Sequence, residues 1–217
     1  FLIGSKKIKK INDNILSKKR IDFISDFVKE LSKNPDAKKF IQIFFLMTWL
    51  SKKRIKKLII KYKKEKLRFG RGLVFHICPS NMPLNFVYSF IFSFLAGNSN
   101  IVKISNKNYK EEAVVLSAIK KVFSKKKYTV FRNTNSFIKY NNEKIINDYY
   151  SCICDIRVIW GGDHTINKIR ESFIKPKTYD VTFPDRYSFS IINLNYLKNK
   201  KKGEFLKIVN KFFHDSY

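Results

Sequence analysis

The 217-residue chain is short of several residue types, and each shortage excludes a class of protein. It holds seven Gly and five Pro, too few for a collagen-like or linker-like chain. Its three cysteines, Cys78, Cys152 and Cys154, form no even disulfide framework, which indicates an intracellular protein. Three His and a Cys-x-Cys pair lack the spacing of zinc sites, so we expect no metal. With 44% hydrophobic residues, the chain is globular rather than disordered.

Acidic residues are scarce too, since 17 Asp and Glu face 45 Lys and Arg, for a formal net charge of +28. Such a charge favours nucleic acid or an anionic membrane as partner. Only eight of the basic residues are Arg, which recognises bases and phosphates in a bidentate manner. The chain is also rich in Asn, Ile, Phe and Tyr, which AT-rich codons encode together with Lys. We interpret most of the charge as compositional bias and expect no specific nucleic acid; a basic nucleic-acid-binding protein is the alternative from another class.

Long hydrophobic runs are missing as well. The two longest, 40–50 and 84–96, have about 11 and 13 residues, whereas a spanning helix needs about 20. We therefore expect two buried helices, no transmembrane segment and a cytoplasmic protein. The chain begins with Phe1 and shows no secretory signal, so we expect an internal boundary there and a fragment of a longer protein.

The first third of the chain has a helical pattern. Ile24, Phe27, Val28 and Leu31 form one apolar stripe at helical spacing, and the turn signal at 34–36 ends that helix. A second helix covers 40–50, and a lysine-rich segment follows. We assign residues 1–68 to a basic helical N-terminal region.

From residue 69 onward, strand and helix patterns alternate. Strands are expected at Leu73–Ile77, Ile101–Ile104, near Tyr128–Arg132, at Asp155–Trp160 and at Tyr187–Asn193; helices are expected up to Ala96, over 109–123, near 141–150, up to Arg170 and over Gly203–Phe213. This alternation predicts an α/β fold, a Rossmann-like, mostly parallel sheet with helices on both faces. We assign 69–195 to a nucleotide-binding domain and 196–217 to the start of a further, truncated domain.

Three of the expected strands end in unusual residues, at Pro79–Pro83, Lys103–Asn106 and Gly161–Asp163. In parallel sheets, ligands bind beyond the carboxyl ends of the strands, so these segments predict a site for a nucleotide or a similar ligand. The G-x-G-x-x-G fingerprint and the phosphate loop are both missing. Gly161 and Gly162 either admit a phosphate to the backbone or form a tight turn without a ligand.

Several segments resemble a known family. Gly72-Leu-Val-Phe-His-Ile-Cys-Pro-Ser-Asn-Met-Pro83 and Leu95-Ala-Gly-Asn-Ser-Asn-Ile-Val-Lys103 resemble the nucleotide-binding half of the aldehyde dehydrogenase superfamily. Val158-Ile-Trp-Gly-Gly-Asp-His-Thr-Ile166 and Phe183-Pro-Asp-Arg-Tyr-Ser188 resemble the LuxC-like acyl-CoA reductases, which supply fatty aldehyde in bacterial luminescence. The resemblance covers about residues 70–217. It implies an oxidoreductase that uses NADPH to reduce a long-chain acyl-CoA or acyl thioester to the aldehyde through an acyl-cysteine.

The resemblance also assigns roles to residues. Asn81 matches the amide that holds the substrate oxyanion, with helix capping as its alternative role, and Lys103 matches the lysine that binds the adenosine ribose. NAD-specific relatives carry Glu where this chain has Asn106, so we expect NADPH to be tolerated. Gly161 and Gly162 match the turn that meets the pyrophosphate. The predicted cofactor-binding residues are therefore Pro79, Ser80, Lys103, Ser105, Asn106, Gly161 and Gly162.

The chain departs from the superfamily pattern in two ways. The segment Thr182–Arg186 lacks the general-base Glu of aldehyde-oxidising relatives, which favours reduction, because such a base would hydrolyse an acyl-enzyme. No Cys follows Asn210–Tyr217, where the family carries its nucleophile. We interpret the three cysteines as small buried residues and expect the chain to be inactive by itself; Asp185 and Arg186 receive no role.

The resemblance further implies partners. They are the acyl-CoA or acyl-thioester substrate, acyltransferase and synthetase subunits of a fatty acid reductase complex, and other copies in a homo-oligomer when the enzyme is complete. A semialdehyde-forming reductase of acyl phosphates, from the same superfamily, is the rival enzyme.

Overall fold

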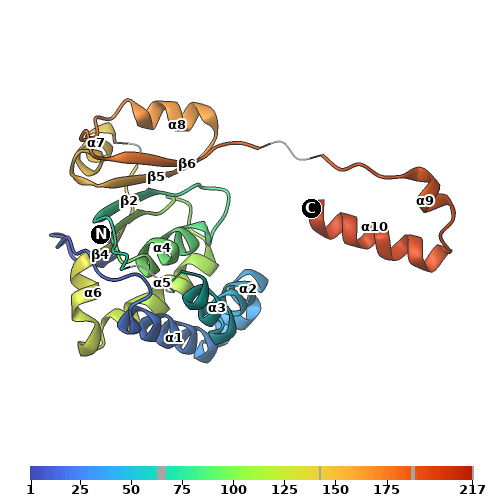
Figure 1. The fold of residues 1–217 in the computed structure, drawn as a ribbon, viewed down its shortest axis with the longest axis horizontal. Helices are drawn as coiled ribbons and strands as arrows, with labels where there is room; N and C mark the ends of the chain where they lie inside the picture. Colours follow the sequence, from blue (N-terminus) through green and yellow to red (C-terminus); the bar gives the residue numbers. More distant parts are fainter. Residues whose placement is uncertain (63–66, 142, 187–188, 217) are drawn as a thin grey trace. The chain divides into compact units, whose positions relative to one another are not determined.

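The computed structural model describes residues 1–62, 67–141, 143–186 and 189–216 (Figure 1). The chain divides into two compact units, Phe1–Asp185 and Arg186–Tyr217. The second unit contains α9 (Leu194–Lys198) and α10 (Lys202–Ser216), so the expected last helix is confirmed. The three-part division that we drew from the sequence stays a prediction.

The first unit is built on a six-stranded sheet with the order β1-β4-β3-β2-β5-β6. Five of its strands are parallel neighbours: β2 (Leu73–Ile77), β3 (Ser99–Lys103), β4 (Asn135–Ile138), β5 (Ile156–Trp160) and β6 (Tyr179–Phe183). The short β1 (Ile3–Gly4) pairs antiparallel with β4 at one edge. The chain proceeds outward from β2 to β4 and then crosses back to β5 on the other side of β2. This reversal is the topological switch at which open α/β sheets bind ligands.

Helices cover both faces of this sheet (Figure 1). One face packs on α1 (Lys18–Lys33), α2 (Ile41–Trp49), α3 (Lys52–Tyr62), α4 (Asn85–Leu95), α5 (Lys110–Phe123) and α6 (Thr129–Thr134), and a 3-10 turn, η1 (Pro35–Lys39), joins α1 to α2. The other face packs on α7 (Lys144–Ile153) and α8 (Asp163–Arg170). The predicted α/β class, with a mostly parallel sheet and helices on both faces, is confirmed.

Aromatic rings make up much of the larger core. Phe23 of α1 lies 4.9 Å from Phe94 and 5.2 Å from both Phe123 and Tyr128, measured between ring centroids. Of the predicted stripe of α1, Ile24, Phe27 and Leu31 are buried and Val28 is half-buried, and Phe23 beside them contacts α4, α5 and the turn before α6. Such tilted and edge-on ring pairs add stability beyond the burial of their area.

Two predicted strands are wrong. Residues 126–134 form the 3-10 turn η2 (Lys126–Tyr128) and α6, and the strand follows at Asn135–Ile138. Tyr128 and Phe131 lie three residues apart and both enter the aromatic core, so tertiary packing overrides their strand propensity. The last strand is Tyr179–Phe183 rather than Tyr187–Asn193, because Tyr179–Phe183 pairs with β5 and Pro184 follows it. Residues 189–193 form no strand, and 187–188 lie outside the described residues.

The two apolar runs differ in burial. The run 84–96 forms α4, which is deeply buried, as predicted. In the run 40–50, Ile43 and Leu46 of α2 are buried, but Phe44 and Phe45 are exposed, so the prediction of a buried helix is wrong for its outer face. No helix among the described residues is both long enough and apolar enough to cross a bilayer.

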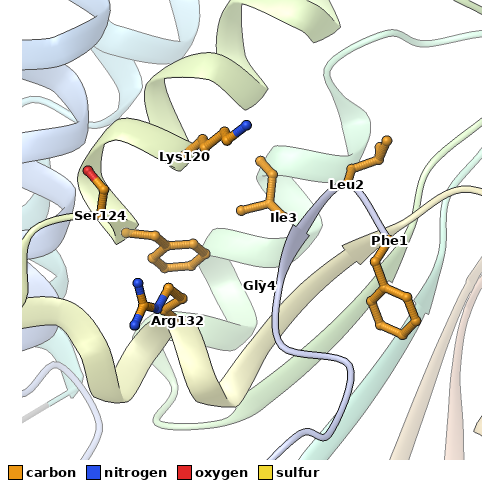
Figure 2. A pocket seen from close by; sticks show the side chains of 8 residues that line it. Phe1, Leu2, Ile3, Gly4, Lys120, Ser124 and Arg132 are labelled. Carbon is orange, nitrogen blue, oxygen red and sulfur yellow. The ribbon is translucent and has the colours of Figure 1, made fainter.

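Two hollows on the first unit lie in different places. One, of about 300 Å³, lies beside β1 between Ile3, Lys120, Phe123 and Arg132 (Figure 2). The other is larger and lies at the carboxyl ends of the parallel strands.

Candidate functional site

A cleft of about 760 Å³ opens where β2, β3 and β5 end. This volume lies in the usual range of ligand-binding pockets, about 300–1,000 Å³. The structure brings all eight predicted site residues to its walls: Pro79, Ser80, Asn81, Lys103, Ser105, Asn106, Gly161 and Gly162. The expected convergence of three strand ends is therefore confirmed, while the role of each residue stays a prediction.

The loop after β2 forms one wall of the cleft. The backbone N–H of Cys78 donates to the carbonyl of Lys103 at 3.3 Å, and the Tyr109 hydroxyl donates to the Ser80 carbonyl at 2.8 Å. These two bonds tie the loop to β3 and to the start of α5. Asn81 is exposed on the cleft, and α4 begins at Asn85 after Leu84 without a side-chain cap. Capping of α4 therefore does not occupy the Asn81 amide.

Lys103 ends β3 and extends along the cleft to an aromatic ring. Its ammonium lies 4.4 Å from the centroid of Tyr140, within the range of a cation–π contact. Burial lowers the pKa of Lys103, and the negative charge of Glu143 opposes that shift. Burial also raises the pKa of Tyr140, which keeps its hydroxyl protonated. This cation is thus held in place at the cleft, where it can meet an anionic or hydroxylated ligand.

Beyond β3, the cleft has amides where a carboxylate was expected in NAD-specific relatives. The Asn106 amide donates to the side-chain oxygen of Asn141 at 2.8 Å, and the backbone N–H of Lys107 donates to the Ser105 hydroxyl at 3.2 Å. Four lysines line the cleft, against a single carboxylate, Glu171; the lysines are Lys103, Lys107, Lys144 and Lys168. This balance of charge favours an anionic ligand.

Gly161 and Gly162 form the turn from β5 into α8. The Gly161 N–H donates to the carbonyl of Phe183 at 3.3 Å, so it continues the sheet and does not point to a ligand. A Cβ on Gly162 would lie 2.5 Å from a carboxylate oxygen of Asp185, so a larger residue there would require the Asp185 side chain to move. His164 and Thr165, in the first turn of α8, line the cleft. The unpaired N–H groups of this turn therefore lie at the cleft, which suits a phosphate.

Trp160 is a wall residue that sequence reasoning missed. Its ring stacks on Phe183 with a centroid distance of 3.7 Å and an interplanar angle of 6°. Its indole N–H donates to the Ser89 hydroxyl at 3.2 Å, and that hydroxyl also bonds to His76 Nδ1 at 2.8 Å. The other nitrogen of His76 bonds to Asn100 at 3.0 Å. A buried polar chain thus fixes the orientation of Trp160 at the end of β5.

Tyr140 and Lys144 were missed for a different reason. Both follow β4, whose position was predicted about seven residues too early, at 128–132 rather than 135–138. The rule that ligands meet strand ends identifies 139–144 only once the fourth strand is placed correctly. The strand order in the sequence indicates this wall of the cleft, but the predicted fourth strand lies at the wrong residues.

Neither Cys78 nor Cys154 has the character of an activated nucleophile, and Cys152 is not among the residues that line the cleft. Cys78 lines the cleft, but burial raises the pKa of its thiol far above the ordinary value. Burial raises the pKa of Cys154 to about 12. Cys152 is exposed, so its predicted burial is wrong, and Cys78 is only half-buried. A neutral thiol is a poor nucleophile. Within the described residues, no group of His, Cys, Asp and Glu could hold a metal ion.

Comparison with known proteins identifies the family of this chain. The family model of the acyl-CoA reductases named LuxC matches residues 9–205. The chain belongs to this LuxC family. No curated protein matches the chain.

The fold of this LuxC-family chain is also found in a solved structure. The glyceraldehyde-3-phosphate dehydrogenase GapN from Methanocaldococcus jannaschii, complexed with NADP, aligns with a TM-score of 0.57 and 13% identity. The alignment covers 76% of this chain and 41% of that one. An NADP-dependent glyceraldehyde-3-phosphate dehydrogenase from Bacillus halodurans, also complexed with NADP, gives 0.49 and 13%, over 74% of this chain and 39% of that one. The LuxC chain thus spans about two fifths of the length of the enzymes that it matches.

Proposed function

We propose that this chain supplies the NADPH-binding half of an enzyme that reduces a long-chain acyl thioester, such as acyl-CoA, to the aldehyde. The observation that carries the proposal is the cleft of a LuxC-family chain at the sheet's switch point, with four lysines on its walls and an amide at Asn106. The matched GapN structure from Methanocaldococcus jannaschii contains NADP, which agrees with this choice of cofactor.

The residues of the cleft fit the chemistry of NADPH. Its pyrophosphate and 2′-phosphate are anions, and the cleft offers lysine ammonium groups and the first turn of α8. Asn106 presents no negative charge to a 2′-phosphate, whereas a glutamate there would repel it. When bound, NADPH supplies the hydride. Lys103 and Asn106 are the residues that we propose to hold its adenosine ribose and 2′-phosphate.

The Asn81 side chain suits the substrate rather than the cofactor. Its amide lies exposed at the cleft mouth and is not used as a helix cap. We propose that it donates a hydrogen bond to the acyl oxygen as negative charge develops there, which lowers the barrier to attack on the thioester. The thiolate that takes up the acyl group is assigned to none of the three cysteines of this chain, because burial raises the pKa of Cys78 and Cys154 and Cys152 does not line the cleft.

The end of β6 supports reduction rather than oxidation. Thr182 and Phe183 are followed by Pro184 and Asp185, and no glutamate occurs in this segment. The Asp185 carboxylate lies against Gly162. A general base that activates water would hydrolyse an acyl-enzyme to the acid. The lack of a glutamate in this segment therefore favours reduction of the acyl group by hydride. The acyltransferase and synthetase partners and the homo-oligomer remain part of this proposal for the complete enzyme.

Titration with NADPH and NADH, followed by quenching of tryptophan fluorescence, tests the cofactor assignment. Trp160 in the cleft wall is a built-in reporter. We expect NADPH to bind more tightly than NADH, and Asn106→Glu to weaken NADPH binding about tenfold while sparing NADH. Asn167→Glu, which introduces the same charge on α8 outside the cleft lining, is the matched control. Tighter binding of NADH by the unmodified chain would contradict the proposal.

A second assay tests the assignment of the nucleophile. We expect the 217-residue chain to catalyse no acyl-CoA-dependent oxidation of NADPH, since its only cleft cysteine has a strongly raised pKa. The measurement is the loss of NADPH absorbance with and without acyl-CoA. Turnover that persists in the chain and disappears in Cys78→Ser would show that Cys78 is the nucleophile after all.

A further inference from the structure

The outer face of α2 is apolar and uncovered within the first unit. Its inner residues Ile43 and Leu46 are fully buried, as expected for a helix that packs on a core. On the opposite side, however, Ile41, Phe44 and Phe45 are exposed by 62%, 57% and 58%. A helix that is hydrophobic all round is normally buried on all sides. We refer to Ile41, Phe44 and Phe45 as the α2 outer face.

Basic side chains flank the α2 outer face in the sequence on both sides. Residues 37–62 contain eight Lys and Arg and no Asp or Glu. Lys38 and Lys39 precede α2, and five exposed bases follow in the first half of α3; these are Lys52, Lys53, Arg54, Lys56 and Lys57. Lys39 forms an ion pair with Asp36 at 2.6 Å. No carboxylate in the part of the chain that the structure describes pairs with the five bases of α3.

This lack of acids is local and is not shared by the other lysine-rich helices. The 16 residues of α1 include Asp22, Asp26 and Glu30, and the 14 residues of α5 include Glu111 and Glu112. Two of these acids, Asp26 and Glu30, pair with Lys125 across the interface between their elements. A general lysine bias accounts for lysines everywhere, but it does not account for a strip without a single acid beside three exposed apolar side chains.

The inner sides of α2 and α3 pack on the core of the first unit. Trp49, at the end of α2, packs on Tyr88 and Phe92 of α4 with centroid distances of 5.1 and 4.9 Å. Ile55 of α3 is buried in the same core as Ile43 and Leu46. In Figure 1, α2 and α3 lie at one end of the first unit. The outer face and the basic residues therefore lie on two consecutive helices that pack on one hydrophobic core.

We infer that α2 and α3 dock this unit on an anionic lipid surface. Exposed aromatic and aliphatic side chains that insert at the level of the headgroups, beside lysines that attract anionic lipid, are the two features that place a helix on a membrane. A second copy of the chain fits less well, because two strips that each carry eight bases and no acid repel one another. Single-stranded nucleic acid would use the bases and would stack on Phe44 and Phe45, but Ile41 offers no ring for stacking and only eight of the chain's 45 basic residues are Arg.

Co-sedimentation of the full chain with vesicles tests this inference. We expect binding to phosphatidylcholine vesicles that contain phosphatidylglycerol and little binding to phosphatidylcholine alone. Phe44→Ser with Phe45→Ser is expected to lower the partition coefficient at least about tenfold, because the apolar anchor is lost. Gln at positions 52, 53 and 56 is expected to lower it about a hundredfold, at about fivefold for each charge.

Matched variants separate this surface from the charge of the whole chain. Gln at Lys121, Lys126 and Lys177 removes the same three charges from exposed sites elsewhere, and Phe173→Ser with Phe189→Ser removes two exposed rings elsewhere. Neither control is expected to change binding more than about twofold. Equal losses in the controls would overturn the inference. So would vesicle binding that survives loss of Phe44 and Phe45. Tight binding of a single-stranded oligonucleotide that is lost both without the two rings and without the three α3 lysines would overturn it as well, because it would assign the surface to nucleic acid.

Discussion

Each face of the central sheet buries one arginine, and the two are held in different ways. Arg157, on β5, is 1% exposed and lies on the side of α7 and α8. Arg20, on α1, is fully buried on the side of α4 and α6. A buried guanidinium is costly unless its donors are satisfied. The partners of each arginine therefore show which contacts stabilise the helices on its face of the sheet.

The hydrogen-bond donors of Arg157 are satisfied by a carboxylate, a hydroxyl and backbone carbonyls. Its Nε and Nη2 donate to the two carboxylate oxygens of Asp180 at 2.7 and 3.0 Å. Its Nη1 donates to the Ser151 hydroxyl and to the carbonyls of Ile169 and Ser172, at 2.9 to 3.2 Å. One side chain thereby links the ends of α7 and α8 to β5 and β6. The smaller core on this face contains Ile169, whose carbonyl is one of these partners.

Arg20 has fewer polar partners and more aromatic ones. Its Nε donates to Asp13 at 2.9 Å and its Nη1 to the carbonyls of Phe94 and Asn98. Its remaining nitrogen, Nη2, has no hydrogen-bond partner within the described part of the chain. Instead, the guanidinium lies 4.7 Å from the ring centroid of Phe94 and 5.2 Å from that of Phe131. The large aromatic core supplies here what carboxylate and carbonyl oxygens supply on the other face.

The largest effect is expected when Arg157 loses its carboxylate. Asp180→Asn leaves a buried, uncompensated charge, and we expect a loss of about 3–5 kcal/mol in the free energy of unfolding. Urea denaturation at pH 7 measures it. Arg170→Gln is the matched control, because Arg170 also pairs with Asp180, at 3.4 Å, but is half exposed; we expect its cost to stay below about 1 kcal/mol. Similar losses in the two variants would show that burial does not set the worth of this carboxylate.

The next largest effect is a dependence of stability on pH that arises from His76, which lies on the Arg20 side of β2. Burial lowers the pKa of His76 to about 4. The unfolded chain therefore takes up a proton near pH 6.5 while the folded chain does not. Stability is thus highest above pH 6.5 and falls as the pH drops toward 4, by about 3 kcal/mol.

Comparison with His76→Gln isolates this contribution. The amide can still bridge Ser89 and Asn100, which bond to the imidazole, but it does not titrate. We expect the variant to show a smaller loss of unfolding free energy between pH 7 and pH 4 than the unmodified chain, as measured by urea denaturation at both. Identical pH profiles would mean that His76 takes no part in the acid sensitivity.

Local pattern was enough to predict the strands that lie in the centre of this sheet. Leu73–Ile77 was predicted with its observed bounds, because a fully buried parallel strand is a continuous apolar run. Gly97, with φ of +90°, ends α4 as its position in the sequence indicates. From the ends of β2, β3 and β5 followed the cleft and its eight predicted residues.

The sequence did not reveal what depends on distant contacts. The segment 128–132 has strand-forming residues, yet Phe131 lies in a helix. It is buried there against Phe23 and Phe94, which are far away in the chain. Phe44 and Phe45 look like core residues by composition alone and lie on the surface. Trp160 was read only as part of a motif, because its bond to Ser89 joins positions 71 residues apart.

The smallest of the three effects is expected at Asp13, the counterpart of Asp180. Burial alone would raise the pKa of Asp13, but the hydrogen bond and charge of Arg20 outweigh it, and the pKa lies below its usual value. Its contribution to stability is therefore complete above the unfolded pKa, near 3.8, and is lost as the pH falls through the lower folded value.

Asp13→Asn is expected to cost about 1–2 kcal/mol at pH 7, less than Asp180→Asn, because the Asp13 side chain is 35% exposed and carbonyls and rings still hold Arg20. Urea denaturation of both variants at pH 7, and of Asp13→Asn and the unmodified chain at pH 3, measures the difference. The difference between the variant and the unmodified chain should be smaller at pH 3 than at pH 7, and it should vanish only below the lowered pKa of Asp13 in the folded chain. If Asp13→Asn cost as much as Asp180→Asn, the aromatic rings around Arg20 would not be replacing the missing oxygen partners, and the contrast between the two faces would fail.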